Sequence, residues 1–362
     1  MKITDVQTYL LAIPIKKDEL HASWRWGAFN QVIVAIHTDE GITGYGEAFG
    51  YGVPHAVFSV IHRVLKPMLV GADPTDIHSF SNRMARQTHL FGRYGITTFA
   101  ISGVDIALWD IAGKCAGLPL YRLFGGAPAL RVPAYASLTR YPNPERMGVA
   151  ALYAKKAGFG AVKIHQIDLE SLRVAREKIG DGLELMVDIN CEWMPEQALH
   201  MARQFAPHKL RWLEEPLWPP EDFKNLAQLG NRCGIPIAAG ENACTVHQFR
   251  QMLEAGAAAY IQPSVIKVGG ITEWRKIAAL AETYNVAVAP HSPYFGPGFL
   301  ATAHLVASTL QADSVEYLCL NLEASIFREP IQIKDGFFSL PQGPGIGLEI
   351  DEAILKHYSV AP

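Results

Sequence analysis

Between about residues 130 and 320, short apolar runs alternate with segments whose apolar residues have helical spacing. The repeat length stays between 24 and 27 residues. Regular alternation of a buried strand and a helix is typical of a parallel sheet. The pattern therefore predicts an α/β fold in which this part of the chain closes into a βα barrel.

The two flanking regions have different patterns. Residues 1–50 alternate apolar and polar positions, which predicts strands joined by a turn at residues 39–41. Residues 55–126 are helical in pattern, with apolar residues at helical spacing between Ser102 and Gly117. The residues after about 327 are rich in Gly and Pro and lack a helical period. We expect this tail to fold back onto the N-terminal region.

Composition excludes several classes of partner. The chain has 362 residues, of which 49% are hydrophobic, and a net charge of −3 gives no basic surface for nucleic acid or anionic membranes. No uncharged apolar run reaches the length of about 18 residues needed to span a bilayer, and the first residues lack the order of a signal peptide, so we expect a cytoplasmic protein. Five scattered cysteines without a CxxC pair indicate neither a disulfide framework nor a zinc site.

Seven ionisable residues follow the apolar runs at gaps of 25, 26, 27, 26, 24 and 25 residues. Each lies at or just beyond the C-terminal end of a predicted strand, and in a closed barrel those ends meet at the face where active sites lie. The series predicts a ring of acids and bases around one pocket. Its members are Lys163, Asp188, Glu214, Glu241, Lys267, His291 and Glu316.

Three successive members of the series are carboxylates that predict a metal site. Asp188, Glu214 and Glu241 should converge from neighbouring strands, and their repulsion must be relieved by protonation or by a cation. Oxygen ligands of this kind suit a hard divalent ion, with Mg²⁺ expected and Mn²⁺ as a substitute. The alternative is a structural ion network with Lys163, Lys267 and an arginine.

The residue pair Lys163 and His165 predicts a general base. Residues two apart on a strand leave the same face, so one can take a proton while the other orients it. A metal that binds a substrate carboxylate stabilises the enediolate formed when the neighbouring carbon loses its proton, and such sites use a Lys or His base. For His165 the alternative is an interior histidine with satisfied hydrogen bonds.

Taken together, these motifs resemble the enolase superfamily, and most closely its mandelate racemase-like sugar-acid dehydratase branch. The resemblance covers essentially the whole chain. It rests on the segments SGVDIALWDIAGK (102–114), KIH (163–165), VDIN (187–190), EEP (214–216), AGEN (239–242), KVGG (267–270), PHS (290–292) and GPGIG (343–347).

The resemblance also implies roles on the opposite side of the barrel. In related proteins the histidine at the position of His291 pairs with an aspartate, and here that position is Ser264. Either His291 acts as a general acid with another partner, or Lys267 replaces it, as in the muconate-lactonising branch. Glu316 would donate a hydrogen bond to the substrate if neighbouring carboxylates keep it protonated.

Substrate contacts are expected from Asn190, which shares a face with Asp188, and from loops of the N-terminal region. Arg25 could clamp a distal carboxylate, and Trp24 and Tyr51 could pack on a sugar face. Alternatively, Asn190 caps a strand end, Trp24 packs against the barrel and Arg25 is a solvated surface charge.

With this resemblance the predicted fold is a modified (β/α)7β TIM-type barrel at residues 129–327. An α+β capping domain would be formed by residues 1–128 and the C-terminal tail, 328–362. The expected substrate is a small carboxylate, a sugar acid or its lactone, and the expected reaction is Mg²⁺-dependent dehydration to a 2-keto-3-deoxy acid. Alternatives are a racemase, an epimerase, a lactone cycloisomerase and a non-catalytic scaffold, and a homo-oligomer is expected.

Overall fold

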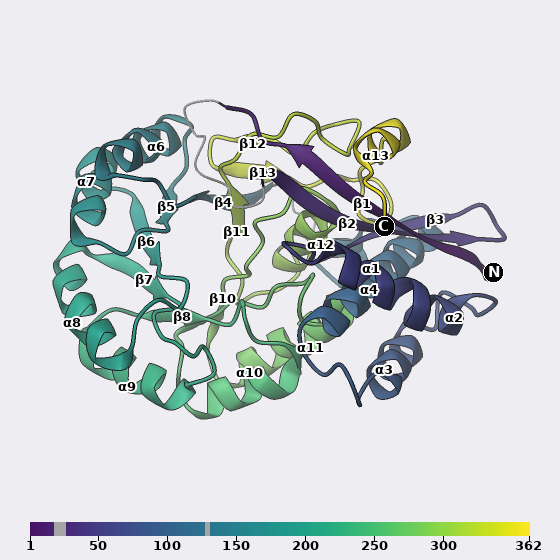
Figure 1. The fold of residues 1–362 in the computed structure, drawn as a ribbon, viewed down its shortest axis with the longest axis horizontal. Coiled ribbons are helices and arrows are strands. Elements are labelled where there is room, and N and C mark those ends of the chain that lie inside the picture. Colours follow the sequence, from purple (N-terminus) through teal and green to yellow (C-terminus); the bar gives the residue numbers. More distant parts are fainter. Residues whose placement is uncertain (18–26, 127–130) are drawn as a thin grey trace.

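The computed structural model describes residues 1–17, 27–126 and 131–362. A three-stranded sheet with its helices lies beside a ring of parallel strands surrounded by helices, and both chain termini lie on the sheet side (Figure 1). The predicted substrate contacts Trp24 and Arg25 lie outside the described residues.

The N-terminal region forms a cap on the barrel. Its antiparallel sheet has the order β1 (Ile3–Pro14), β2 (Ala28–Thr38) and β3 (Thr43–Ala48), as the alternating pattern predicted. The helical segments that follow are α1 (Pro54–Val60), a π-helical turn (Ile61–Leu65), α2 (Lys66–Leu69), α3 (Ile77–Gln87), α4 (Ile96–Ala116) and α5 (Leu120–Leu123).

Helix α4 is the central element between the cap sheet and the barrel. It packs against β3 on one side and against a barrel helix on the other. A Cβ on Gly46 of β3 would lie 2.0 Å from the Gly103 carbonyl oxygen, so glycine permits this close approach. The helix ends at Gly117, which has a φ of 65°. Among the described residues only α4 is long and apolar enough to cross a membrane, and 78% of that stretch is buried within the protein.

Polar side chains of α4 attach the cap to the barrel. Ser102 Oγ accepts the Gly269 N–H at 2.8 Å, and Asp105 Oδ2 accepts the Thr272 N–H at 2.9 Å. Both donors belong to the start of α11 (Gly270–Thr283) and the loop before it, which carries Lys267. The polar residues of the 102–114 motif therefore position a segment of the barrel mouth.

These contacts give a testable pH dependence of stability. Burial raises the pKa of Asp105 to about 7, above the value of about 3.9 in an unfolded chain. The folded protein therefore holds more protons at Asp105 between these values, and stability falls as the pH rises through that window. Asp105→Asn keeps an acceptor for Thr272 without this ionisation. It should lose less stability than the wild type between about pH 5 and about pH 8 in denaturant unfolding, and equal losses would contradict the assignment.

The barrel consists of eight parallel strands with seven helices between them in the described part of the chain. Neighbouring strands pair in sequence order from β4 to β10, and β11 returns to pair with β4. This confirms the predicted βα barrel. The strands are β4 (Arg131–Leu138), β5 (Ala161–Ile164), β6 (Glu184–Asp188), β7 (Leu210–Glu214), β8 (Ile237–Ala239), β9 (Tyr260–Ile261), β10 (Ala287–Val288) and β11 (Val315–Leu318).

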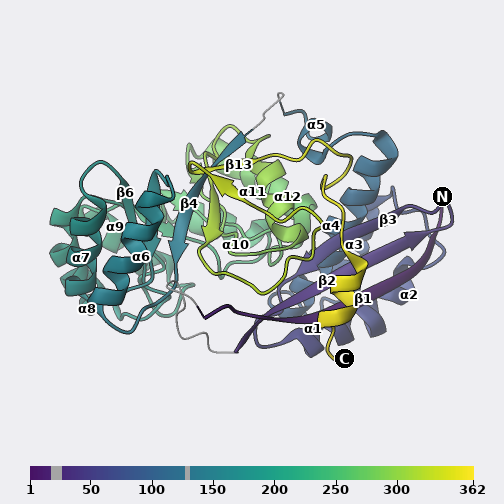
Figure 2. The same ribbon diagram turned by 90° about the horizontal axis from the view of Figure 1, so that it is seen from above.

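The barrel helices form the outer ring in Figure 1, and Figure 2 shows the ring from the side, next to the cap. They are α6 (Pro144–Lys156), α7 (Leu169–Ile179), α8 (Pro195–Phe205) with a short 3-10 turn (Ala206–His208), α9 (Phe223–Cys233), α10 (Thr245–Glu254), α11 and α12 (Pro297–Val306). Inside the strand ring, a separate cluster that includes Tyr135, Met186 and Trp212 fills the space below the mouth. The barrel therefore has a packed floor under the site.

The C-terminal tail contacts both parts of the molecule. The hairpin β12 (Ile333–Lys334) and β13 (Phe337–Ser339) pairs with the start of β4, and α13 (Glu352–Tyr358) lies against β1. The expectation that the tail has no helix was wrong, because Asp351 accepts N–H groups of the first turn and starts α13. The domain limits at 128 and 327 stay predictions.

Candidate active site

The predicted series lies at one end of the barrel. Lys163 and Glu316 lie within β5 and β11, Asp188 and Glu214 end β6 and β7, and the other three follow β8, β9 and β10 in loops. Lys267 lies six residues beyond β9, because that strand is only two residues long and residues 264–269 turn instead of extending it.

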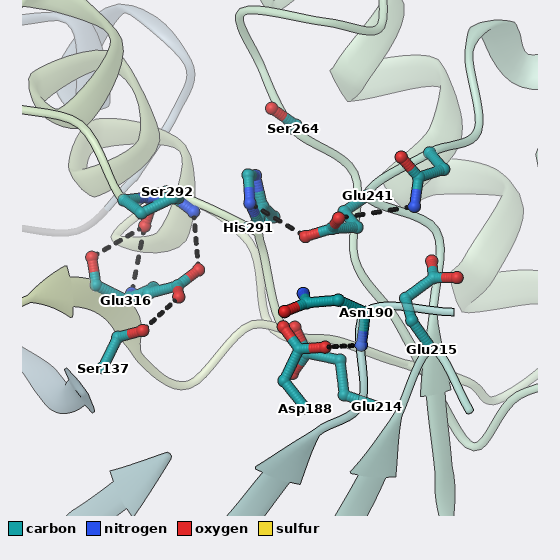
Figure 3. Close-up of polar contacts among 12 residues, drawn as sticks. Ser137, Asp188, Asn190, Glu214, Glu215, Glu241, Ser264, His291, Ser292 and Glu316 are labelled. Carbon is teal, nitrogen blue, oxygen red and sulfur yellow. Dashed lines mark hydrogen bonds and ion pairs between the residues drawn. The ribbon is translucent and has the colours of Figure 1, made fainter. Parts of the chain in front are cut away.

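The three predicted metal ligands come together. One oxygen atom from each of Asp188, Glu214 and Glu241 lies within 4.8 Å of the others, and Figure 3 shows these side chains turned toward a common space. Asp188 Oδ2 is buried and accepts no hydrogen bond from the described residues, although Lys163 Nζ and His165 Nε2 lie 3.8 Å and 3.2 Å from it. Burial raises the pKa of Glu214 well above its ordinary value, against the opposing effect of Lys163. Clustered carboxylates with an orphaned buried oxygen are the donor set that a hard divalent cation satisfies.

Lys163 is fully buried between acidic partners. Its Nζ lies 2.6 Å from Glu214 Oε1, 2.8 Å from Glu316 Oε1 and 3.8 Å from Asp188 Oδ2. Burial alone would lower the pKa of Lys163, but the carboxylates of Glu214 and Glu316 raise it well above its usual range. The ammonium group is therefore the stable form in this arrangement.

His165 lies next to Lys163 at the mouth. Its Nδ1 is 2.6 Å from the Leu138 carbonyl oxygen, which can only accept, so Nδ1 carries a hydrogen. Its Nε2 is 3.2 Å from Asp188 Oδ2. The histidine therefore lies between the end of β4 and the carboxylate cluster, and its role as the orienting partner of Lys163 stays a prediction.

His291 approaches the cluster from the other side. Its Nε2 is 2.9 Å from Glu241 Oε2, and its Nδ1 is 3.0 Å from the Tyr294 hydroxyl. Burial would raise the pKa of Glu241, but His291 and Lys267 beside it lower the pKa below its ordinary value. Ser264 bonds to the Tyr294 hydroxyl. The structure thus gives His291 a partner other than an aspartate, and the choice between His291 and Lys267 as the acid on this side stays a prediction.

Lys267 is largely buried beneath the cap. Its Nζ lies 5.0 Å from the centre of the Phe49 ring, on the loop after β3. It forms no ion pair among the described residues, so the alternative of a lysine paired directly with the metal carboxylates is not observed here. Its charge still lowers the pKa of Glu241.

The expectation that Glu316 is a protonated donor was wrong. Its Oε1 accepts from Lys163 and from Ser137 Oγ, the latter at 2.6 Å, and its Oε2 accepts from the Ser292 N–H at 3.1 Å. Figure 3 shows the contacts with Ser137 and Ser292. Burial would raise the pKa of Glu316, but Lys163 and His291 lower it to about 2. Glu316 is therefore an ionised acceptor that holds Lys163.

Glu215, next to Glu214, is turned away from the carboxylate cluster and holds a neighbouring loop. Its Oε1 accepts the Gly240 N–H at 2.8 Å, and its Oε2 lies 3.4 Å from Cys191 Sγ. The contact fixes the backbone immediately before Glu241.

A cavity of about 550 Å³ at the barrel mouth is lined by four members of the series, Glu241, Lys267, His291 and Glu316, and by His165. Asn190 lines it, and its N–H donates to Asp188 Oδ1 at 2.8 Å. Tyr51 lines it from the cap, and its hydroxyl donates to the Pro293 carbonyl at 2.7 Å. The lining also includes Phe49, Ser137, Thr139, Arg140, Pro293 and Leu318.

Sequence reasoning missed the contribution of the first barrel strand. Ser137, Thr139 and Arg140 follow or end β4, and Arg140 Nε donates to the His165 carbonyl at 2.9 Å. This segment lies one repeat interval before Lys163, so the periodicity could have predicted that it ends at the same face of the barrel. Ser137 was overlooked because it does not ionise.

Two family models match the chain. The model of the mandelate racemase / muconate lactonizing enzyme N-terminal domain matches residues 25–125, and the model described as enolase C-terminal domain-like matches residues 147–354. The chain belongs to the mandelate racemase / muconate lactonizing enzyme family of the enolase superfamily. The predicted membership is confirmed.

Relatives in this family include sugar-acid dehydratases and cycloisomerases. Arabinonate dehydratase of Saccharolobus solfataricus is 33% identical over 98% of this chain and 99% of its own length. The 3,6-anhydro-alpha-L-galactonate cycloisomerase of Streptomyces coelicolor is 35% identical over 96% of this chain and 97% of its own length. A crystal structure of a racemase from Streptomyces coelicolor with bound magnesium has a TM-score of 0.88 and 33% identity, covering 99% of this chain and 100% of that one.

Proposed function

We propose that this protein is a Mg²⁺-dependent sugar-acid dehydratase that removes the proton next to a substrate carboxylate and then eliminates water. The proposal is carried by two different proton-transfer groups on different members of the carboxylate cluster: Lys163 contacts Glu214, and His291 contacts Glu241. Relatives named as dehydratases of sugar acids support the substrate class.

Asp188, Glu214 and Glu241 would hold the Mg²⁺ ion, for which Mn²⁺ could substitute. Three carboxylates without a nitrogen or sulfur donor match the preference of hard divalent ions for oxygen. When bound, the ion supplies Lewis-acid stabilisation of the negative charge that develops on the substrate carboxylate.

Lys163 is the group that we assign as the base. Its ammonium group must first give up one proton to water, since only the neutral amine can act as a base. Glu214 and Glu316 stabilise that ammonium group, and Glu214 would stabilise it less if it held the metal ion. The lysine then takes the proton from the carbon next to the substrate carboxylate, which leaves an enediolate. His165 orients this side through Leu138 and Asp188.

His291 is assigned as the acid of the second step. Its protonated ring gives the Nε2 proton to the hydroxyl oxygen on the next carbon, the carbon–oxygen bond breaks, water leaves and the ring becomes neutral. The resulting enol takes up one proton at carbon and becomes the 2-keto-3-deoxy acid. Asn190, Arg140 and Tyr51 would contact the rest of the sugar acid in the 550 Å³ cavity.

The test is proton NMR of the protein with Mg²⁺ in D₂O against a panel of mono- and diacid sugars and their lactones. We expect signals of a 3-deoxy-2-keto product with one substrate class and none after EDTA treatment. Deuterium incorporation next to the carboxylate without loss of water would instead indicate an epimerase. A panel without product or exchange would favour a non-catalytic scaffold.

A second candidate is a sugar-lactone or anhydro-sugar cycloisomerase. It is favoured by the 35% identity to a named cycloisomerase. The first proton transfer would be the same, but the expelled oxygen would remain attached to the sugar. The product would therefore be an isomer of the substrate, with the same mass. The homo-oligomer predicted from the cap loops stays a prediction.

A further inference from the structure

Two residues that follow β4 line the outer part of the cavity. Thr139 and Arg140 come directly after the strand, whose residue Ser137 contacts Glu316 near the carboxylate cluster. Barrel strands point toward the mouth, so residues beyond a strand end lie further out than residues within the strand. A substrate that places one carboxylate at the cluster can therefore bring its other end to Thr139 and Arg140.

Thr139 has a hydroxyl group without a partner. The residue is 8% exposed, and its Oγ1 is buried and makes no hydrogen bond with any residue that the structure describes. A buried hydroxyl without a partner is unfavourable, and a ligand in the cavity that Thr139 lines can supply that partner. Because a hydroxyl both donates and accepts, it matches the hydroxyl groups of a sugar.

The charge of Arg140 is already balanced by the protein. Its Nη1 lies 3.3 Å from Glu192 Oε1 and 3.1 Å from Glu192 Oε2, and its Nε donates to the His165 carbonyl at 2.9 Å. Its Nη2 makes no hydrogen bond within residues 1–17, 27–126 and 131–362. The Arg140–Glu192 pair therefore has no net charge, but it can still donate from Nη2 and accept at the carboxylate.

The loop that carries Glu192 is held on both sides of this residue. The Cys191 N–H donates to the Glu215 carbonyl at 2.7 Å. Trp193 is 2% exposed, and its ring packs edge-on against Phe205 of α8. Glu192 therefore keeps its place beside Arg140 through contacts that involve no substrate.

We propose that Thr139, Arg140 and Glu192 form a subsite for the hydroxyl-bearing end of a sugar acid with one carboxylate, and that Glu192 disfavours sugar diacids. The inference rests on the proposed function for the class of substrate, and it chooses between the mono- and diacids of that class. A second carboxylate in this place would meet the negative charge of Glu192 and find Arg140 occupied. A terminal hydroxyl can instead donate to Glu192 and accept from Arg140.

Glu192→Gln tests the proposal because glutamine keeps the length of the side chain and removes its charge. We measure kcat/KM for each monoacid sugar that yields product and for the diacid of the same configuration, which has a second carboxylate at the far end. The wild type should prefer the monoacid. In Glu192→Gln, Arg140 can pair with the second carboxylate, so the preference should fall by about 10-fold, the low end for hydrogen bonds to charged groups because the pair is partly exposed.

Glu170→Gln is the matched control for this change. Glu170 also lies beside an exposed arginine, Arg173, but on α7 at the outside of the barrel, so the preference should stay at the wild-type value. Thr139→Val removes only a hydroxyl and should raise KM for the monoacid more than it lowers kcat, since the hydroxyl acts away from the reacting carbons. Equal kcat/KM for mono- and diacid in the wild type, or an unchanged preference in Glu192→Gln, would overturn the subsite and leave the dehydratase standing.

A binding measurement separates this inference from the proposed function. Calorimetry in the presence of Mg²⁺ gives the affinity of the wild type and of Glu192→Gln for the same pairs of mono- and diacid sugars. A wild type that forms no product but binds a monoacid more tightly than its diacid, with a smaller difference in Glu192→Gln, would reject the dehydratase and keep the subsite. Binding of no sugar acid, or equal affinity for the two members of each pair, would overturn the subsite.

Discussion

Replacing Lys163 by methionine should lower the rate of product formation by about 10²- to 10⁴-fold, the contribution of a positioned general base. Methionine has a similar length and fills the buried position, but it cannot take a proton. Deuterium exchange next to the substrate carboxylate should fall by the same factor, because exchange and elimination share the first proton transfer. Product formation and exchange are both followed by NMR in D₂O.

Lys163→Met also removes the cation that lies against Glu214 and Glu316. Retention of Mg²⁺ binding, measured by calorimetry, would show that the carboxylate cluster is intact in the variant. Lys356→Met is the matched control, because this exposed lysine lies on α13, away from the barrel mouth. Exchange at the wild-type rate in Lys163→Met would contradict the assignment and transfer the role of base to His165.

The barrel and the identity of most site residues could be predicted because both depend on local spacing. A strand–helix unit has a nearly constant length, and parallel strands present their C-terminal ends at one face. The ends of β6 and β7 therefore brought Asp188 and Glu214 together in the structure as expected. The carboxylate cluster was predictable from the same rule, since three acids repeat with the strands.

Hydrogen-bond partners could not be predicted, because they depend on tertiary contacts between loops. Ser264 indicated only that a carboxylate was missing, and nothing in the spacing identified Tyr294 as the residue beside His291. The charge of Glu316 was predicted wrongly for the same reason. The sequence places acids near it, but the atoms that reach its oxygens are donors from Ser137, Lys163 and Ser292.

In the cap, the sequence revealed a motif but not the structural role of its residues. The polar residues in the 102–114 segment interrupt an apolar helix, and their contacts could not be predicted from the sequence alone. In the structure Ser102 and Asp105 accept backbone N–H groups at the start of α11. They hold the loop of Lys267, so the motif contributes to the site through position.

Removing one predicted metal ligand should abolish the stabilisation of the protein by Mg²⁺. A ligand that binds only the folded state stabilises it by about 2.7 kcal/mol at 100 times its dissociation constant. The wild type should therefore show a rise in melting temperature with Mg²⁺, and a similar rise with Mn²⁺. In Glu214→Gln this rise should be absent, and product formation should fall to the level seen with EDTA, since an amide keeps the shape of the side chain but loses the charge.

The neighbouring residue provides a closely matched control for this experiment. Glu215→Gln makes the same chemical change one residue further on, at a buried acid that accepts the Gly240 N–H and is not part of the cluster. It should keep the rise in melting temperature with Mg²⁺, whatever its effect on the stability of the metal-free protein. Glu214→Gln also removes the ion pair with Lys163, which changes the melting temperature of the metal-free protein. The two variants are therefore compared by the rise in melting temperature that Mg²⁺ causes, and not by the melting temperatures themselves. An equal Mg²⁺ response in Glu214→Gln and Glu215→Gln would place the metal elsewhere and leave Asp188 and Glu214 as structural partners of Lys163, and Glu241 as the partner of His291.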